Sequence, residues 1–373
     1  MALQTVNIGS APNDGTGDPA RTAFGKVNAN FAELYGIYGS EVETQTFTSK
    51  QDDLAINDYT RILRWDGAGS TGISGLALAA GRVATIVNAS TDYLLWLENQ
   101  NTASAATNRF MLPDGFPAFL MPGDSITVWK DGTTDRVRVL DWPTRGVQAG
   151  FSLFSDFLDQ CGSSSDIAGG SSGTGAGQSS GYEANAYASG MRKIYTGTAT
   201  TGLASIAGYQ AGMYKTPGRG GLVGGSLFVV TATNGTETFS VEVGFTWGDA
   251  ASATHAAAWE YRWNGSAAEL AQTWISNGAI TRSTSGSPSV TSPDITTRPF
   301  HLLVFLNDAW TRADYIYSTD GVAYTLAQSV ATTFSAGSPR FAPAFAVKKS
   351  AGTTSRTVVA DWFGVRLREG GAR

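Results

Sequence analysis

Thr238-Phe-Ser-Val-Glu-Val-Gly-Phe-Thr-Trp247 alternates apolar and other residues along its length. Successive side chains of a β-strand point to opposite faces of the sheet, so this alternation predicts a half-buried strand. Its apolar face carries Phe239, Val241, Val243, Phe245 and Trp247. Further along the chain, Trp259, Tyr261 and Trp263 follow the same spacing of two. We expect these rings to fill the core between two sheets.

More strands are predicted towards the C-terminus. Tyr315–Ser318 and Ala323–Leu326 flank Asp320-Gly321, a dipeptide typical of hairpin turns. Val358–Leu367 is predicted as one further strand. His301 lies in the nearly continuous apolar run 299–306 and is expected to be structural. Many strands with no convincing helix indicate a β-sandwich.

The order of these elements resembles the concanavalin-type jelly roll, over roughly residues 190 to 368. The resemblance rests on a hairpin like Tyr317-Ser-Thr-Asp-Gly-Val-Ala-Tyr324 and on a last strand like Ala360-Asp-Trp-Phe-Gly364. Members of this family bind carbohydrates, bind proteins or cap a structure, so the resemblance implies a fold and no single activity. We expect residues 146–373 to form this lectin-like domain, with the Gly/Ser-rich segment 162–181 as a long loop within it.

Aromatic residues are plentiful, with 10 Trp and 13 Tyr. Aromatic faces offer sugars an apolar surface, while Asn and Asp at loop ends can meet hydroxyl groups. Two tryptophans stand beside such loop residues. The candidate carbohydrate-binding residues are Trp274, Asn277, Asn307, Asp308 and Trp310.

The sequence contains few residues of the kinds that carry out catalysis or bind metals. The chain has two histidines, far apart, and a single cysteine, Cys161, which excludes an internal disulfide or a Cys-rich zinc site. No Gly-rich stretch has phosphate-loop spacing. Carboxylates in the last domain are mostly single and associated with turns, although Asp308 with Asp314, or Glu260 with Asp361, could meet in space. We expect no enzyme, catalytic residue, cofactor or metal, with polysaccharide hydrolysis as a minor alternative.

A second, smaller β-module is predicted over residues 46–145. Asp131-Gly132 is expected to supply the turn of a hairpin within it. Its short β-rich runs, separated by Asn, Asp, Ser, Gly and Pro, are 82–88, 93–97, 109–112, 125–129 and 136–140. These runs predict a small sandwich or barrel.

The first 45 residues contain a predicted turn and helix. Asp18 suits the N-cap position and Pro19 the first helical position. The 3-4-3 spacing of Phe24, Val27, Phe31 and Leu34 places them on one stripe. A helix this short does not hold in water alone, so we expect the stripe to pack on its own chain or on copies of itself.

The segment Asn13-Asp-Gly-Thr-Gly-Asp-Pro-Ala-Arg-Thr-Ala-Phe-Gly-Lys-Val-Asn-Ala-Asn-Phe-Ala-Glu-Leu-Tyr35 resembles the N-terminal segment of many tailed-bacteriophage virion proteins, particularly fibres and spikes. The resemblance implies a structural protein that is anchored to the particle, as a tail fibre or, alternatively, as a head or neck fibre or capsid decoration. Fibre proteins of this kind are commonly homotrimers that attach to host surface polysaccharide. The implied anchoring or oligomer residues are Asp14, Asp18, Pro19, Arg21, Phe24, Val27, Phe31, Leu34 and Tyr35.

The charge content of the chain limits the classes of partner that it can bind. Only 15% of the residues are charged, against about 25% in average proteins, and the formal net charge is -5. Without a basic excess, we expect no nucleic-acid partner. No apolar run approaches membrane-spanning length and no signal peptide is recognisable, so we expect assembly into a virion in the host cytoplasm, without membrane insertion.

Overall fold

A computed structural model describes the chain in segments. The described segments are 4–11, 14–39, 42–58, 60–141, 152–155, 168–172, 176–179, 192–207, 221–230, 238–247, 256–276, 279–290, 295–332, 341–353, 355, 357–360 and 363–367.

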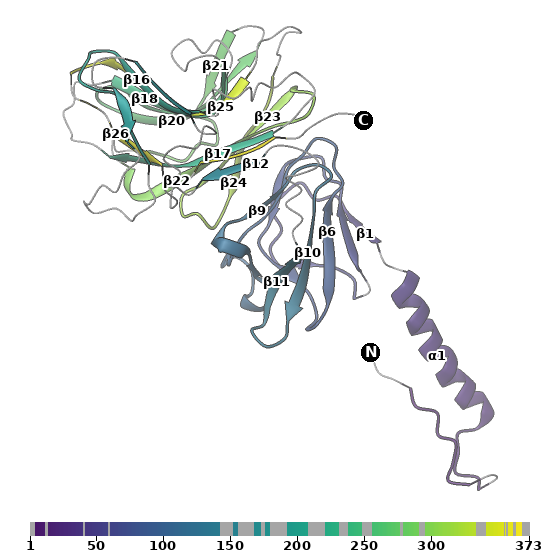
Figure 1. The fold of residues 1–373 in the computed structure, drawn as a ribbon. Coiled ribbons are helices and arrows are strands. Elements are labelled where there is room, and N and C mark those ends of the chain that lie inside the picture. The colour runs from purple at the N-terminus through teal and green to yellow at the C-terminus, as the bar shows by residue number, and fades with distance from the viewer. Residues whose placement is uncertain are drawn as a thin grey trace.

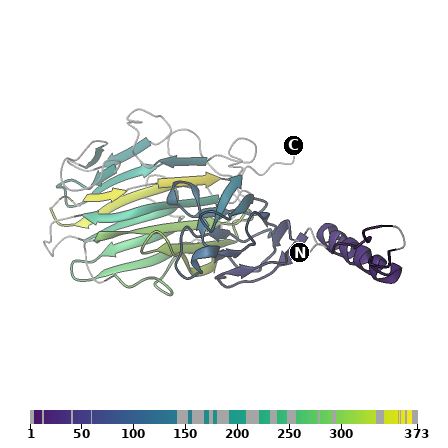
Figure 2. The ribbon, with the colours of Figure 1, turned by 90° about the horizontal axis from the view of Figure 1, so that it is seen from below.

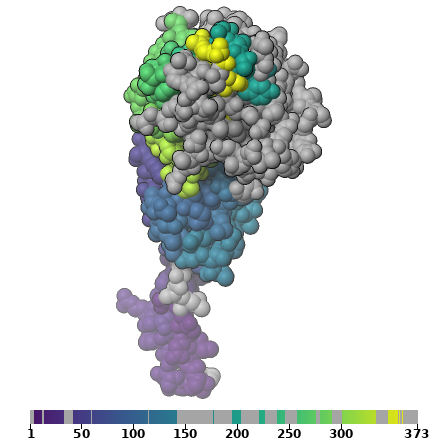
Figure 3. Space-filling model, turned by 90° about the vertical axis from the view of Figure 1, so that its left-hand side faces the viewer, coloured from purple at the N-terminus to yellow at the C-terminus, as the bar shows by residue number. Residues whose placement is uncertain are grey.

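The described chain forms three parts in sequence order (Figures 1 and 3). Helix α1 (Ala20–Gly39) extends away from the rest of the molecule as an arm. A small β-module follows the arm, and a larger β-sandwich lies at the opposite end from it. The mainly β fold class with a short N-terminal helix is therefore confirmed.

The β-module is built around one mixed sheet of order β1-β3-β6-β10-β11-β8. Its strands are β1 (Val42–Gln45), β3 (Ile62–Trp65), β6 (Val83–Asn88), β8 (Phe110–Met111), β10 (Ser125–Asp131) and β11 (Arg136–Asp141). Smaller sheets and two 3₁₀ helices complete it: β2 (Leu54–Ala55), β4 (Thr71–Ile73), β5 (Leu76–Ala77), β7 (Leu95–Leu97), β9 (Ala118–Leu120), η1 (Ala106–Asn108) and η2 (Pro113–Gly115). Because β1 pairs in parallel with β3, the sheet begins at Val42, within the segment grouped with the anchor from sequence.

The sandwich consists of two large sheets, which lie as two layers in Figure 1, while Figure 2 looks onto the strands. The nine-stranded sheet contains β12 (Ser152–Ser155), β14 (Gly177–Ser179), β15 (Arg192–Tyr195), β17 (Gly221–Val230), β22 (Ile295–Leu306), β23 (Arg312–Ser318), β24 (Thr325–Ala331), β26 (Thr357–Ala360) and β27 (Phe363–Leu367). The seven-stranded sheet contains β13 (Ala168–Ser172), β16 (Gly202–Ala207), β18 (Thr238–Trp247), β19 (Ala256–Trp263), β20 (Ala268–Ser276), β21 (Ala279–Ser283) and β25 (Phe341–Ala351).

The core between these sheets confirms the strand predicted over Thr238–Trp247. Strand β18 has the predicted bounds, and Phe239 and Phe245 are buried on its inner face. Trp259, Tyr261 and Trp263 join the same buried cluster with residues of the nine-stranded sheet. The alternation of apolar residues therefore located the core correctly.

Three local predictions need correction. The β10–β11 hairpin forms, but Asp131 pairs with Arg136, so its loop is longer than two residues and Asp135 carries the positive φ, not Gly132. Val358–Leu367 is split into β26 and β27, which both pair with β17. Part of the Gly/Ser-rich segment 162–181 forms strands β13 and β14, so it is not simply a loop.

Candidate functional site

Asp14 organises the turn that precedes the helical arm. Its carboxylate accepts hydrogen bonds from the backbone N–H groups of Ser10, Ala11 and Thr16, at 2.6 to 2.8 Å. The Ser10 hydroxyl donates a further bond to it. These hydrogen bonds, that from the Thr16 N–H first, hold the pKa of Asp14 well below its ordinary value. The acidic residues of this motif therefore have a local structural role.

Asp18 does not cap the helix as predicted. Residues 4–7 lie along α1, and the Asp18 carboxylate accepts hydrogen bonds from the Asn7 N–H at 2.9 Å and from Lys26 Nζ at 2.7 Å. Pro19 O instead accepts the first helical bond, from Ala23 N–H, so Pro19 stands at the cap position and α1 begins at Ala20. Asp18 is used to tie the N-terminal segment to the helix.

The apolar stripe of α1 lies open on the arm. The relative exposure of Phe24 is 68% and that of Phe31 is 51%, while Val27 is half-buried and Arg21 exposed. The side chains of Leu34 and Tyr35 lie outside the described part. Phe24 and Phe31 therefore contribute exposed apolar surface to the arm.

Asn30 fastens the first described residues to the arm, since its side chain both accepts a bond from Gln4 N–H at 3.0 Å and donates one to Gln4 O at 2.9 Å. Asn30→Ala removes both bonds. We expect it to lower the free energy that holds residues 4–7 against α1 by about 1 kcal/mol. Faster amide hydrogen exchange at residues 4–7 measures the effect. Asn28→Ala, at an exposed position of the same helix, is the control. Equal exchange in the two variants would contradict this role.

The structure places two of the residues proposed from sequence to bind sugar in the interior. Asn307 and Trp310 are buried, with 3% and 2% exposure. Asn307 Oδ1 accepts hydrogen bonds from the backbone N–H groups of Thr311 and Arg312, and Trp310 belongs to the sandwich core. Trp274 is half-buried against that core. Asn307 and Trp310 are therefore interior residues, and sugar binding by them stays a prediction. Asn277 lies outside the described residues, and Asp308 is half-exposed.

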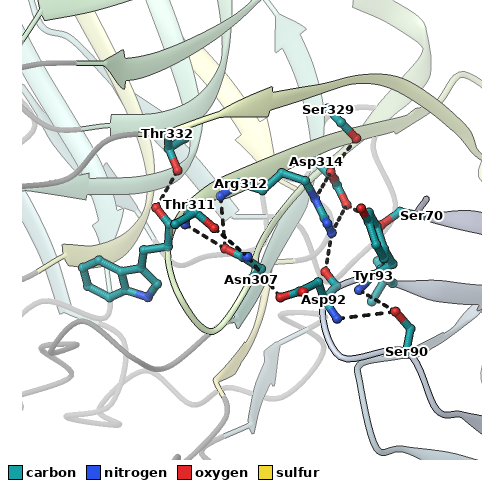
Figure 4. Close-up of polar contacts among 12 residues, drawn as sticks. Ser70, Ser90, Asp92, Tyr93, Asn307, Thr311, Arg312, Asp314, Ser329 and Thr332 are labelled. Carbon is teal, nitrogen blue, oxygen red and sulfur yellow. Dashed lines mark hydrogen bonds and ion pairs between the residues drawn. The ribbon is translucent and has the colours of Figure 1, made fainter. Parts of the chain in front are cut away.

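Asn307 and its neighbours instead join the sandwich to the β-module (Figure 4). Asn307 Nδ2 donates to Asp92 Oδ1 at 3.2 Å. The guanidinium of Arg312 lies 3.7 Å from the centroid of the Tyr93 ring, donates to Asp92 O and forms an ion pair with Asp314. The fully buried Asp314 also accepts a hydrogen bond from the Ser70 hydroxyl. A charged network thus crosses the junction.

An apolar cluster continues the junction. Trp96, Leu94 and Met121 of the module pack against Leu222, Leu303, Phe305, Ile316 and Tyr324 of the sandwich. Phe119 meets Tyr324 edge-on, with 5.5 Å between ring centroids. The module thereby covers the outer face of β17, β22 and β23. Apolar residues on both faces of β22 explain its nearly continuous apolar sequence.

His301 lies beside this junction and gives it a pH dependence. Its Nδ1 lies 2.6 Å from the Tyr324 hydroxyl, and burial lowers the pKa of His301 to about 4, although the charge of Asp320 opposes the shift. Because the unfolded chain takes up the proton near pH 6.5, we expect about 3 kcal/mol of stability to be lost as the pH falls from about 6.5 towards 4. Urea unfolding between these values measures the loss. A His301→Gln variant with an equally steep dependence would contradict it.

The outer face of the seven-stranded sheet carries a different set of groups. Glu242 and Glu260 face each other across β18 and β19. Lys348 Nζ lies 2.9 Å from Glu242 Oε1, and Arg282 bonds both Glu260, at 2.6 Å, and Glu269, at 2.7 Å. We call Glu242, Glu260, Glu269, Arg282 and Lys348 the outer charged face. Sequence reasoning missed this cluster, because it depends on strand register.

Comparisons with known proteins place the chain in no family. No family model matches it. No curated protein matches it either. The solved structures that resemble parts of it include a protein of unknown function from Shewanella oneidensis MR-1 (14% identity, TM-score 0.41, covering 60% of this chain and 89% of that one). They also include peanut lectin (8% identity, TM-score 0.34, 60% and 99%) and the CBM2 module of the evolved Dit of Lactobacillus casei BL23 phage J-1 (9% identity, TM-score 0.37, 61% and 100%). At these values the likenesses carry no functional argument.

No group of three or more His, Cys, Asp or Glu side chains in the described segments is placed to hold a metal ion. Within the same segments, no helix combines the length and hydropathy needed to span a membrane.

Proposed function

We propose that this chain is a fibre or spike subunit of a tailed-bacteriophage virion, which anchors through its N-terminal arm and presents the β-sandwich to host surface carbohydrate. The observation that carries the proposal is the arm itself. It extends from one end of the molecule with Phe24 and Phe31 exposed, while the sandwich lies at the other end (Figure 1). The phage-like sequence of the same segment supports this assignment.

The exposed stripe supports self-association, and we propose a homotrimer in which α1 packs against its copies. Burying two phenylalanines and a valine for each chain removes apolar surface from water at every helix contact. The face that carries Asn30 and Lys26 is already occupied by the chain's own residues 4–7. Self-association therefore uses the opposite, apolar side of the arm.

The junction supports the proposed fibre role because it joins the β-module and the sandwich into one continuous body. Buried hydrogen bonds, a cation–π contact and apolar contacts cross it, and an attachment force applied at the sandwich would be carried to the arm through them. The outer charged face is the surface we assign to carbohydrate. Its carboxylates and guanidinium can bond sugar hydroxyls in pairs, and Glu269 remains 44% exposed.

Antibody labelling of intact particles tests the position. An antibody raised against the sandwich is expected to decorate the tail of the virion that carries this chain. Label at the neck or over the head would instead support the head-fibre or decoration alternative. Particles that carry no label would contradict a virion component altogether.

Binding of the full-length chain to immobilised bacterial capsular polysaccharides and lipopolysaccharide O-chains tests the carbohydrate role. We expect saturable binding to a subset of this panel. Arg282→Ala is expected to weaken that binding, whereas Arg64→Ala, in an exposed ion pair of the module, serves as the control. Binding that is equal in both variants would contradict the assignment of the outer charged face.

A further inference from the structure

One face of the six-stranded sheet of the β-module carries apolar side chains that are open to water. The opposite face forms the core of the module, in which Leu63, Ile86 and Val128 are buried. Successive side chains of a strand point to opposite faces, so the neighbours of these core residues point outwards. We call the outward apolar set the module face, and its members are Val42, Ile62, Val83, Met111, Trp129 and Leu140.

Strand register places members of the module face side by side. Val42 is directly opposite Ile62 on the paired strands β1 and β3. Ile62 is in turn opposite Thr85, which stands two residues from Val83 on the same side of β6. Val83 is directly opposite Trp129 of β10. These pairings make the module face one continuous patch across four neighbouring strands.

The exposure of this face is concentrated rather than scattered. Relative exposure is 56% for Val42, 45% for Val83 and 60% for Leu140. Among the described residues, five of the nine exposed large apolar side chains lie on the module face, three lie on the arm and its N-terminal segment, and one, Ile280, lies on the sandwich. Single exposed apolar residues are normal, but contiguous patches mark interaction surfaces. The module face therefore requires a partner.

The charges beside the module face suit contact with a copy of the same face. Arg138 forms an ion pair with Asp131 at 2.8 Å, and Arg64 forms one with Asp66 at 2.9 Å. Both arginines are thus neutralised within their own chain. Arg136, at the end of β11, adds a cation at the rim, where water screens it. Copies of this face therefore meet little repulsion between like charges.

The arm brings the module faces of different copies close together. Helix α1 ends at Gly39 and β1 begins at Val42, so at most about 11 Å of chain separates them. Packed helices lie about 8–10 Å apart. In a trimer held by its arms, the β1 strands of neighbouring copies therefore begin within roughly 30 Å of one another. Because β1 is the edge strand of the module sheet, the module face starts beside the axis of the arms.

We propose that the module face is a subunit interface, and that the module faces of three copies meet around the axis on which their arms pack. The occupant of the face is thus the same face of the neighbouring copies. This inference rests on the proposed homotrimer and adds a second contact surface to the arm.

The size of the module face explains why both surfaces are needed. Six strands of two to seven residues, about 4.8 Å apart and rising about 3.3 Å per residue, form a face of roughly 450 Å². A stable interface buries about 800 Å² on each partner. The module face alone falls short of that area, and the arm offers only a narrow stripe. We therefore expect the trimer to need both.

Light scattering over a series of protein concentrations tests the interface in the full-length chain. Leu140→Lys and Ile62→Lys each place a charge on the module face, where assembly would bury it without a partner. For each variant we expect the concentration at which the trimer dissociates to rise at least about 10-fold. Ile280→Lys is the matched control, since Ile280 has 59% exposure against 60% for Leu140 and stands on the sandwich. Circular dichroism and the urea midpoint check that each variant is folded.

Three results would overturn the inference. If the unchanged chain is a trimer and both variants associate as tightly, the module face is not a subunit contact, while the arm contact stands and the face is left for another virion protein. If Ile280→Lys weakens the trimer as much as Leu140→Lys does, the loss comes from added charge alone. If the unchanged chain is a monomer at every concentration, the arm contact fails together with the module face.

Discussion

Asp314→Ala is expected to lower the free energy of unfolding of the full-length chain by about 3–5 kcal/mol, because it leaves a largely buried guanidinium without its carboxylate. Asp314 is fully buried, and Arg312 Nε and Nη2 lie 2.9 and 3.0 Å from its two oxygens. The Ser70 and Ser329 hydroxyls also donate to it. The substitution therefore removes the centre of the network at the junction.

Urea unfolding followed by tryptophan fluorescence measures this loss as a lower midpoint. Asp66→Ala is the matched control, since Asp66 also pairs with an arginine, Arg64, but at an exposed position where such pairs contribute about 0–1 kcal/mol. If the two variants unfold at the same urea concentration, Asp314 does not hold the junction as described.

Trp259→Ala is expected to cost a further large amount, about 3–5 kcal/mol, through the cavity left in the sandwich core. The indole is fully buried, its Nε1 donates to Leu303 O at 2.9 Å and Ile316 O at 3.1 Å, and it meets Tyr315 edge-on. These contacts join the two sheets across the core. Removing the ring therefore loses contacts in both sheets.

The same unfolding measurement, with near-ultraviolet circular dichroism to follow packing of the aromatic rings, tests the role of Trp259. Ile280→Ala is the control, because Ile280 stands on β21 of the same sheet with 59% exposure and is expected to change stability by about 0.5 kcal/mol or less. A Trp259→Ala protein as stable as this control would place the core elsewhere.

Local sequence was sufficient for the strands of the sandwich core. The apolar face of β18 and the rings of Trp259, Tyr261 and Trp263 could be recognised because a strand repeats every two residues. The helical arm could be recognised in the same way. Period and turn residues act over a few positions, so they are visible without any knowledge of tertiary structure.

Contacts between distant segments could not be predicted in this way. Asn307 and Trp310 have the residue types of a binding loop, yet Asn307 is bonded to Asp92 of the module and Trp310 is buried in the core. Whether such a loop is open depends on what packs over it. The parallel pairing of the polar strand β1 with β3 likewise has no local signal.

The outer charged face shows the same limit. Glu242 and Glu260 are each unremarkable polar residues of an alternating strand. They meet because β18 and β19 pair in one register, and a shift by one residue would send one of them into the core. A cluster of side chains that depends on strand register can be recognised only once the pairing of the strands is known.

The solution mass of the purified full-length chain, measured by light scattering, tests the fibre proposal most directly. We predict about three times the single-chain mass of 39.1 kDa. A double substitution of Phe24 and Phe31 by Ser is expected to lower that mass to one chain, while Asn28→Ala leaves it unchanged. A full-length protein that remains a monomer would contradict the self-associating arm and favour a monomeric decoration protein.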